Sequence, residues 1–299
     1  MNSKDTRLGV IALVLVTLIW GLTFPLIKNS TQQFPPFAFV AVRFFIGGIG
    51  LWIFRKRFPS LLRVQESKGR SEWLAGALLG GVLFFGNGLQ TLGMRYTSAS
   101  NAAFITGLTV VIVPLILVFQ GSKIIPQTWG AVIGSIIGIA LLSLNEHFQF
   151  NFGDLLVLAC ATAFALHIVL IPKFSHRFDA VRLTEAQLLT VSLVSFLASV
   201  VFERESWGSL HITSELMGSL FYCGILATAV AFLVQTVFQK KVSPVKTALI
   251  FSCEPVFGAF FAYWVNSETL TAIQYAGGGL MVLAMVIGEW RSESMAQSP

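Results

Sequence analysis

The sequence predicts an all-α integral membrane protein with ten transmembrane helices, arranged as two inverted five-helix repeats. Three observations lead to this fold class: the composition, a recurrence of apolar runs about 20 residues long, and a similarity between the two halves of the chain. Of the 299 residues, 55% are hydrophobic and only 11% are charged, whereas a soluble domain carries about 25% charged residues. Most of the exterior of this protein must therefore face lipid.

The apolar runs define ten candidate spans, separated by polar or charged breaks. Each run is long enough to cross a hydrocarbon core of about 30 Å as a helix. The first run follows Lys4 and Arg7, and its length favours a transmembrane helix over a signal peptide. The predicted spans are 8–27, 36–54, 73–92, 98–119, 127–144, 153–172, 183–202, 214–236, 244–265 and 270–289.

Basic residues set the predicted orientation of these spans. If the N-terminus lies inside, the inside segments carry most of the 20 Lys and Arg residues, and the outside segments carry only Lys28, Arg95 and Arg204. This positive-inside bias predicts a multi-pass protein of the cell (inner) membrane with both termini in the cytoplasm. The formal charge of +6 then reflects topology, so we expect the lipid bilayer as a partner and no nucleic acid.

The two halves of the chain are similar at a constant offset. Residues 90–111 align without a gap on residues 235–256, and the same shift of 145 superposes Lys28 on Lys173. Because each unit holds five helices, an odd number, the second must cross the membrane in the opposite sense. Inverted repeats are typical of secondary transporters, which bind their substrate at the repeat interface. The expected repeats are 8–146 and 153–289.

Four stretches of the sequence resemble a known family. They are "LIWGLTFPLIK" (18–28), "FVAVRFFIGG" (39–48), "RYTSASNAAFITGLTVVIVPL" (95–115) and "VSPVKTALIFSCEPVFGAFFAYWVNSETLT" (242–271). With these stretches the chain resembles the drug/metabolite transporter superfamily, in the branch with two tandem EamA-type domains. The resemblance implies a ten-helix permease, and many members export amino acids or other metabolites.

The expected function is therefore secondary transport, by alternating access, of a small metabolite such as an amino acid or a drug-like compound, directed outward. The chain has no G-x-x-x-x-G-K-[ST] loop, so we expect no ATP hydrolysis, no cofactor and no enzymatic activity. A proton or a counter-substrate would drive the transport, in a monomer or a homodimer. Two alternatives stay open: a membrane-embedded enzyme acting on a lipid or isoprenoid substrate, and a non-transporting membrane subunit.

Ionisable residues inside the predicted spans are costly and are therefore candidates for function. Glu254 lies 11 residues beyond Ser243, or about 16 Å along a helix, which is near the midplane. It could carry a proton, meet a substrate amine or pair with Arg43. Arg43 could instead bond helix ends, and His167 could be a hydrogen-bonded packing residue. Lys246 could be a gate or an interfacial anchor.

Two prolines predict helix breaks in the two halves. Pro255 removes a backbone donor and should kink the ninth span, and Pro114 should break the fourth. Paired breaks of this kind point to a binding region, although ordinary kinks would look the same. We therefore assign Pro114 and Pro255, with Glu254, Lys246 and Arg43, to coupling or gating.

Uncharged polar residues complete the candidate site. Asn87 and Gln90 are three residues apart and share a helix face, and Trp20 could form an aromatic wall. Each could equally join neighbouring helices. The residues expected to contact substrate are Trp20, Asn87, Gln90, Asn101, Thr106, His167, Gln235 and Glu254. No metal site is expected, because Cys160, Cys223 and Cys253 all fall within apolar runs.

Overall fold

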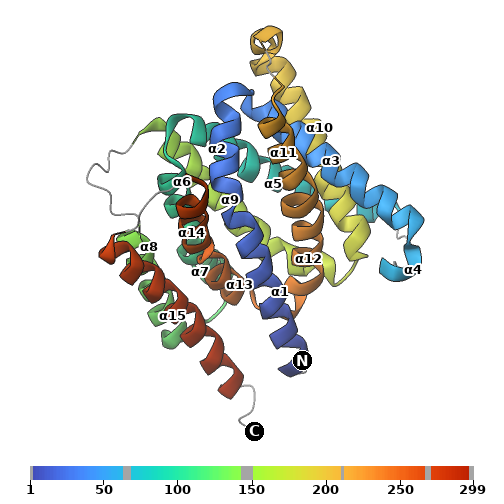
Figure 1. Cartoon of the computed structure of the whole chain (residues 1–299). Helices are drawn as coiled ribbons and strands as arrows, with labels where there is room; N and C mark the ends of the chain where they lie inside the picture. Colours follow the sequence, from blue (N-terminus) through green and yellow to red (C-terminus); the bar gives the residue numbers. More distant parts are fainter. Residues whose placement is uncertain (1–2, 63–68, 143–150, 210–211, 267–270, 296–299) are drawn as a thin grey trace.

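The computed structural model describes residues 3–62, 69–142, 151–209, 212–266 and 271–295, and these form helices with no strand (Figure 1). The all-α prediction is thereby confirmed. The first half contains α1 (Ser3–Gly21), α2 (Thr23–Gln33), α3 (Pro36–Arg57), α4 (Pro59–Leu62), α5 (Arg70–Tyr96), α6 (Ala99–Gly107), α7 (Thr109–Phe119) and α8 (Pro126–Leu142). The second half contains α9 (Phe152–Ser175), α10 (Ala180–Phe202), η1 (Arg204–Ser209), α11 (Ser214–Phe221), η2 (Tyr222–Val230), α12 (Ala231–Phe238), η3 (Gln239–Lys241), α13 (Pro244–Phe251), α14 (Glu254–Asn266) and α15 (Ala272–Met295).

Seven helical segments are long and apolar enough to cross a membrane. They match the first four predicted spans and the sixth to eighth, and they are Asp5–Gln33, Pro36–Arg57, Arg70–Tyr96, Asn101–Phe119, Phe152–Ser175, Ala180–Phe202 and Ser214–Lys241. The fifth and tenth predicted spans contain the shorter apolar helices Thr128–Leu141 and Ala272–Ile287. The ninth is divided between α13 and α14. Ten crossings therefore remain a prediction.

The pattern of burial is the reverse of that in a soluble protein. Large apolar side chains such as Phe119 and Phe202 are exposed on the outer faces of the helices, at 88% and 76%. Charged and polar side chains such as Arg43, Asn87 and Glu185 are buried. An apolar surface of this extent requires a non-aqueous surrounding, and buried polar groups are then confined to the helix interfaces.

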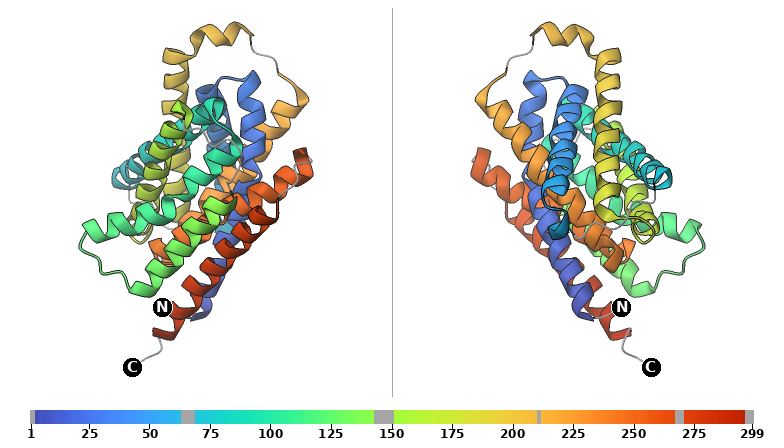
Figure 2. Two further views of the ribbon diagram at one scale, coloured as in Figure 1. Left: turned by 90° about the vertical axis from the view of Figure 1, so that its left-hand side faces the viewer. Right: turned by 90° about the vertical axis from the view of Figure 1, so that its right-hand side faces the viewer.

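Glycines allow the closest helix contacts. A Cβ on Gly80 of α5 would lie 2.7 Å from the carbonyl oxygen of Gln187 on α10, and a Cβ on Gly138 of α8 would lie 2.8 Å from that of Gly277 on α15. Helices α3 and α10, α5 and α9, and α8 and α15 form the most extensive pairs. Figures 1 and 2 show α8 and α15 side by side along one flank, and α1 beginning at the end of the bundle where α15 ends.

Polar caps fix where two of the interior helices begin. The Ser98 hydroxyl accepts a hydrogen bond from the N–H of Asn101, the third residue of α6, and Ser243 accepts one from the N–H of Lys246, the third residue of α13. These caps satisfy backbone donors that no helical carbonyl can reach. The two serines are 145 residues apart, so the two halves begin these helices in the same way.

The helix breaks also occur at equivalent positions, but one is not where the sequence predicted it. Pro114 lies inside α7, which runs through it, and the break between α6 and α7 falls at Leu108. The break between α13 and α14 includes Cys253, which is 145 residues later. The Leu108 N–H donates to the Ile105 carbonyl at 3.1 Å, and the Cys253 N–H donates to the Ile250 carbonyl at 3.1 Å. The expectation that Pro114 breaks its helix was wrong, because the tight hydrogen bonds at Leu108 already break the helix before the chain reaches Pro114.

Candidate functional site

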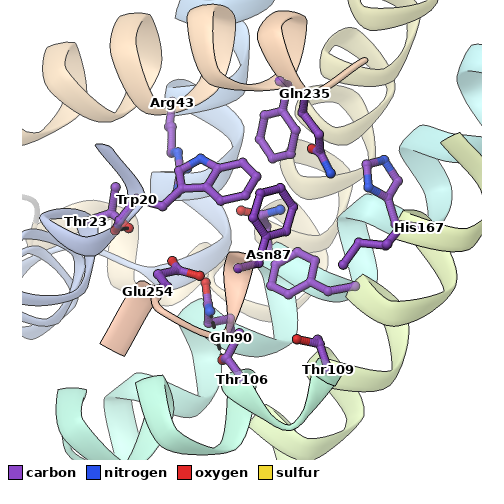
Figure 3. A pocket seen from close by; sticks show the side chains of 14 residues that line it. Trp20, Thr23, Arg43, Asn87, Gln90, Thr106, Thr109, His167, Gln235 and Glu254 are labelled. Atoms are coloured by element: carbon purple, nitrogen blue, oxygen red, sulfur yellow. Dashed lines mark hydrogen bonds between the residues drawn. The ribbon is translucent and has the colours of Figure 1, made fainter. Parts of the chain in front are cut away.

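A cavity of about 50 Å³ lies in the interior of the bundle (Figure 3). It is lined by residues of α1, α2, α3, α5, α6, α7, α9, α12, α13 and α14. Half of the lining residues come from each half of the chain. They are Trp20, Thr23, Arg43, Asn87, Gln90, Thr106, Thr109, Phe164, His167, Ile168, Phe232, Gln235, Phe251 and Glu254.

Most lining residues form pairs separated by the same 145 residues that relate the two halves. The first-half members are all polar, whereas the second-half members are aliphatic, aromatic, amide or acidic. The pairs are Thr23 and Ile168, Asn87 and Phe232, Gln90 and Gln235, Thr106 and Phe251, and Thr109 and Glu254. The cavity therefore lies between equivalent surfaces of the two halves, and its two walls differ in polarity.

Glu254 is the first residue of α14, and Thr109 is the first residue of α7. Both side chains line the cavity (Figure 3). The start of a helix carries unpaired N–H groups and a partial positive charge, which favours a carboxylate at that place. Among the described residues the Glu254 carboxylate has no hydrogen-bond or ion-pair partner. It is therefore an ionisable group with oxygens available to a ligand.

Arg43 is buried, with 3% of its surface exposed. Its Nε donates to the Thr228 hydroxyl at 2.8 Å, and Nη2 lies 3.5 Å from the Ala227 carbonyl oxygen. The guanidinium also lies 5.3 Å from the centre of the Phe44 ring. In the part of the chain that the structure describes, Arg43 forms no ion pair with Glu254. The two groups thus face one cavity separately (Figure 3), and a guanidinium with five N–H donors keeps some of them for a ligand.

Trp20 shares a backbone partner with Arg43. The indole Nε1 donates to the Ala227 carbonyl at 2.9 Å, and its ring lies 5.3 Å from Phe232 and 5.1 Å from Phe251 between centroids. Ala227 belongs to η2, a π-helical segment, and wide π-helical turns are frequent at functional sites. These three rings form an aromatic wall of the cavity.

His167 is held from outside the cavity by Gln187 of α10. The Gln187 amide nitrogen donates to the Leu183 carbonyl at 3.2 Å, so its oxygen lies toward His167 Nε2, at 2.8 Å. With the amide oriented in this way, the Gln187 oxygen can only accept, so His167 Nε2 must carry the hydrogen that it donates. Gln187 therefore fixes the orientation of the imidazole.

The amides of the cavity are only partly satisfied. Gln90 donates to the Thr106 hydroxyl at 3.1 Å, a bond drawn in Figure 3. Gln235 donates to Gln239 Oε1 at 3.0 Å, and Gln239 donates to the Ile168 carbonyl at 2.6 Å. The Gln235 amide oxygen is buried without a partner among the described residues. A buried acceptor of this kind gains free energy when a ligand or water donates to it.

The structure brings together eight residues that the sequence analysis selected: Trp20, Arg43, Asn87, Gln90, Thr106, His167, Gln235 and Glu254. Four selected residues do not line the cavity. Asn101 lies in the first turn of α6 and Lys246 at the equivalent position of α13. Pro114 is buried inside α7. Pro255 follows Glu254 in α14, and its Cγ would lie 3.7 Å from a Cβ on Gly107.

Six lining residues were not selected from the sequence as members of the site: Thr23, Thr109, Phe164, Ile168, Phe232 and Phe251. Five of them stand three residues from a selected one, as Thr23 does from Trp20 and Phe251 does from Glu254. Side chains three apart share a helix face. Helical spacing was therefore the signal that would have found Phe164 and Phe232, which share a helix with His167 and Gln235; the other three pairs span a helix break.

The described residues contain no group of three or more His, Cys, Asp or Glu side chains placed to hold a metal ion. Cys160, Cys223 and Cys253 are buried free thiols. The chemistry that these residues offer is therefore binding through charge, hydrogen bonds and aromatic contact.

A family model, described as the EamA-like transporter family, matches residues 7–144 and again residues 151–287. The chain belongs to this family. This confirms the resemblance to EamA-type members of the drug/metabolite transporter superfamily. With the seven apolar spans, it also identifies a multi-pass membrane protein.

Relatives of similar length share most of the chain. An uncharacterized transporter of Archaeoglobus fulgidus is 33% identical over 93% of this chain and 84% of its own length. The uncharacterized transporter YvbV of Bacillus subtilis is 27% identical over 97% of this chain and 93% of its own. The uncharacterized inner membrane transporter YedA of Escherichia coli is 24% identical over 92% of this chain and 89% of its own length.

A crystal structure of another protein has the same fold. It superposes on this one over 100% of both chains with a TM-score of 0.76, at 21% sequence identity. At that identity the similarity concerns the arrangement of the helices alone.

Proposed function

We propose that this protein is a secondary transporter that exports a small metabolite, such as an amino acid or a drug-like compound, by alternating access. The observation that carries the proposal is the cavity, because half of its lining comes from each half of the chain at positions 145 residues apart. A site placed between two related halves can open to either side of the membrane when the halves rock against each other. The family and the names of its relatives support transport over catalysis.

Helix packing supports two inverted repeats of five helices. Helix α3 pairs with its counterpart α10, and α8 pairs with its counterpart α15. The contact of α5 with α9 has its counterpart in the contact of α12 with α1. Self-paired helices and reciprocal contacts are expected when a two-fold axis relates two units.

The lining groups suggest which solute the cavity accepts. Glu254 offers a carboxylate, Gln235 an unpartnered amide oxygen, and Arg43 guanidinium N–H donors. Trp20, Phe232 and Phe251 offer an apolar wall. A small zwitterion with an apolar side chain would satisfy both charges and cover the wall. Glu254 would bind the ammonium group or carry the coupling proton.

The first experiment identifies the substrate. Cells that overproduce the protein are compared with cells that produce Glu254→Ala, and metabolites in the medium are profiled. We expect at least one compound to accumulate with the wild-type protein and not with Glu254→Ala. Glu205→Ala is the matched control, because this exposed carboxylate lies in η1 outside the cavity. Equal profiles for wild type and Glu254→Ala, at equal amounts of protein in the membrane, would contradict the proposal.

A further inference from the structure

The contacts between helices differ at the two ends of the bundle. We call the end where α1 begins the N-terminal end, and the end where α2 finishes the far end (Figure 1). At the far end, Lys28 Nζ donates to the carbonyls of Met94 and Thr97 at 2.7 and 2.8 Å. The Thr97 hydroxyl donates to Asp154 Oδ1 at 2.5 Å. These bonds join the middle of α2 and the end of α5 to the start of α9.

The bonds at the far end are enclosed. Thr97 is 4% exposed and Asp154 is fully buried. The second oxygen of Asp154 accepts the Asn151 N–H at 2.9 Å, so the carboxylate is fixed by its own capping box. Bonds to a charged group that water does not reach are the strong ones. Gly153 adds a close backbone contact, because a Cβ there would lie 2.9 Å from the Thr97 nitrogen.

At the N-terminal end the equivalent contact lies between α1 and the residues around η3, and its central side chains are apolar. A Cβ on Gly9 would lie 2.9 Å from a methyl of Val242 and 3.4 Å from the Phe238 carbonyl oxygen. Phe238 and Val242 stand 145 residues after Gly93 and Thr97, the residues that Gly153 faces. By this contact Gly9 takes the place of Gly153, at an offset of 144 residues, one fewer than the 145 that relates the lining residues. It follows that Val10 takes the place of Asp154, and Val242 that of Thr97.

The N-terminal contact is held by weaker interactions. Val10 and Val242 belong to one apolar cluster. The ion pair beside them, Lys241 Nζ to Asp5 at 3.2 Å, is exposed to solvent, and exposed pairs contribute little. Lys173, the counterpart of Lys28, also differs. It donates to the exposed Gln120 side chain at 3.2 Å, whereas Lys28 donates to two carbonyls at the end of α5.

We propose that Lys28, Thr97 and Asp154 form a latch that keeps the far end closed, so that the cavity opens first at the N-terminal end by separation of α1 from η3. The hydrogen bond from Gln239 to the Ile168 carbonyl holds η3 to α9 during this movement. Helix α1 is therefore the element that moves away from η3. Release of the latch is then the step that exposes the cavity at the far end.

The test measures access to the cavity and needs no substrate, so it can fail independently of the proposed transport function. Thr109→Cys places a thiol on the cavity wall, and the chain without it measures background from the three buried native cysteines. A charged, membrane-impermeant methanethiosulfonate is applied from either side of sealed vesicles. The parent should react faster from the side of the N-terminal end. Thr97→Val, which installs the residue found at the other end, should raise the rate from the far side by roughly tenfold or more.

The matched control is Thr91→Val in α5, the helix that Thr97 follows. Thr91 is 1% exposed, and its hydroxyl has no partner among the described residues, so this change removes no bond and should leave both rates as in the parent. If Thr97→Val does not fold, Asp154→Asn gives the same comparison. Equal rates for Thr97→Val and Thr91→Val would overturn the latch, and so would a rise from both sides alike. Val10→Asp with Val242→Thr, which builds a second latch, should slow the reaction from the N-terminal side.

Discussion

At the scale of single residues, the cavity shows how two related halves can diverge without changing the backbone. Asn87 and Phe232 occupy equivalent positions, as do Thr109 and Glu254. In the first pair a polar amide corresponds to an apolar ring, and in the second a neutral hydroxyl corresponds to a carboxyl group. The break that begins α7 forms with Thr109, so the backbone there does not require a carboxylate. Glu254 is therefore explained by what it faces and not by the fold.

The pair of His167 and Gln187 gives a prediction at this scale. Gln187→Leu should lower stability, because the His167 Nε2 hydrogen loses its acceptor at 2.8 Å in a buried site. The expected cost is about 1–3 kcal/mol. The same change in a His167→Phe background should cost less, because no donor is left unpaired. Unfolding midpoints of the four proteins in detergent measure the coupling. Additive effects would show that the bond does not orient His167.

At the scale of elements, glycine positions decide which helices approach. A Cβ on Gly80 would lie 2.7 Å from both the Gln187 carbonyl oxygen and the Thr190 Cβ, whereas a Cβ on Gly81 meets nothing within 4 Å. The two residues are neighbours on α5, so they differ in packing and not in helix position. The contact of α5 with α10 therefore depends on Gly80.

Replacing each glycine by alanine separates packing from helix propensity. Gly81→Ala should keep or raise the unfolding midpoint in detergent, since Ala is favoured over Gly in a helix by about 1 kcal/mol. Gly80→Ala should lower it, because backbone atoms of α10 cannot move aside cheaply. Equal shifts for the two variants would contradict the close contact of α5 with α10.

The sequence predicted some elements well and others poorly, for physical reasons. Apolar length is a local property, so the spans that became α3, α9 and α10 could be predicted. The break at Leu108 could not, since no proline or charge marks it and α7 accommodates Pro114. Gly107 packs toward Ile139 and Pro255, which are distant in sequence. The position of the break is therefore a tertiary property.

The candidate site could be predicted in part, because ionisable residues deep inside a predicted membrane span indicate a functional site. Arg43, His167 and Glu254 were selected because ionisable groups are costly inside a membrane, and all three line the cavity. Lys246 was selected for the same reason, but it lies in the first turn of α13, close to the helix end. Apolar wall residues such as Phe232 carry no such signal, because most phenylalanines in this chain face lipid or pack in the core.

At the scale of the whole molecule, the cavity and the proposed latch belong to the same movement, in which the cavity opens first at the N-terminal end. The halves share the cavity at equivalent positions, and the bonds that hold α5 to α9 at the far end are more deeply buried than the ion pair that holds η3 to α1 at the N-terminal end. A carrier of this kind has a preferred resting side, because the weaker closure separates first. The substrate would then release the latch by occupying the cavity between the halves.

The central claim is that Glu254 acts on the transported solute or its coupling ion inside this cavity. The most direct measurement uses proteoliposomes and the compound identified from the medium, with exchange and gradient-driven uptake measured for wild type, Glu254→Gln and the control Glu205→Gln. Glu254→Gln keeps the shape of the side chain and removes its charge, so we expect at least one of the two activities to fall by roughly tenfold or more, while Glu205→Gln keeps both. Unchanged exchange and unchanged gradient-driven uptake in Glu254→Gln would contradict the claim.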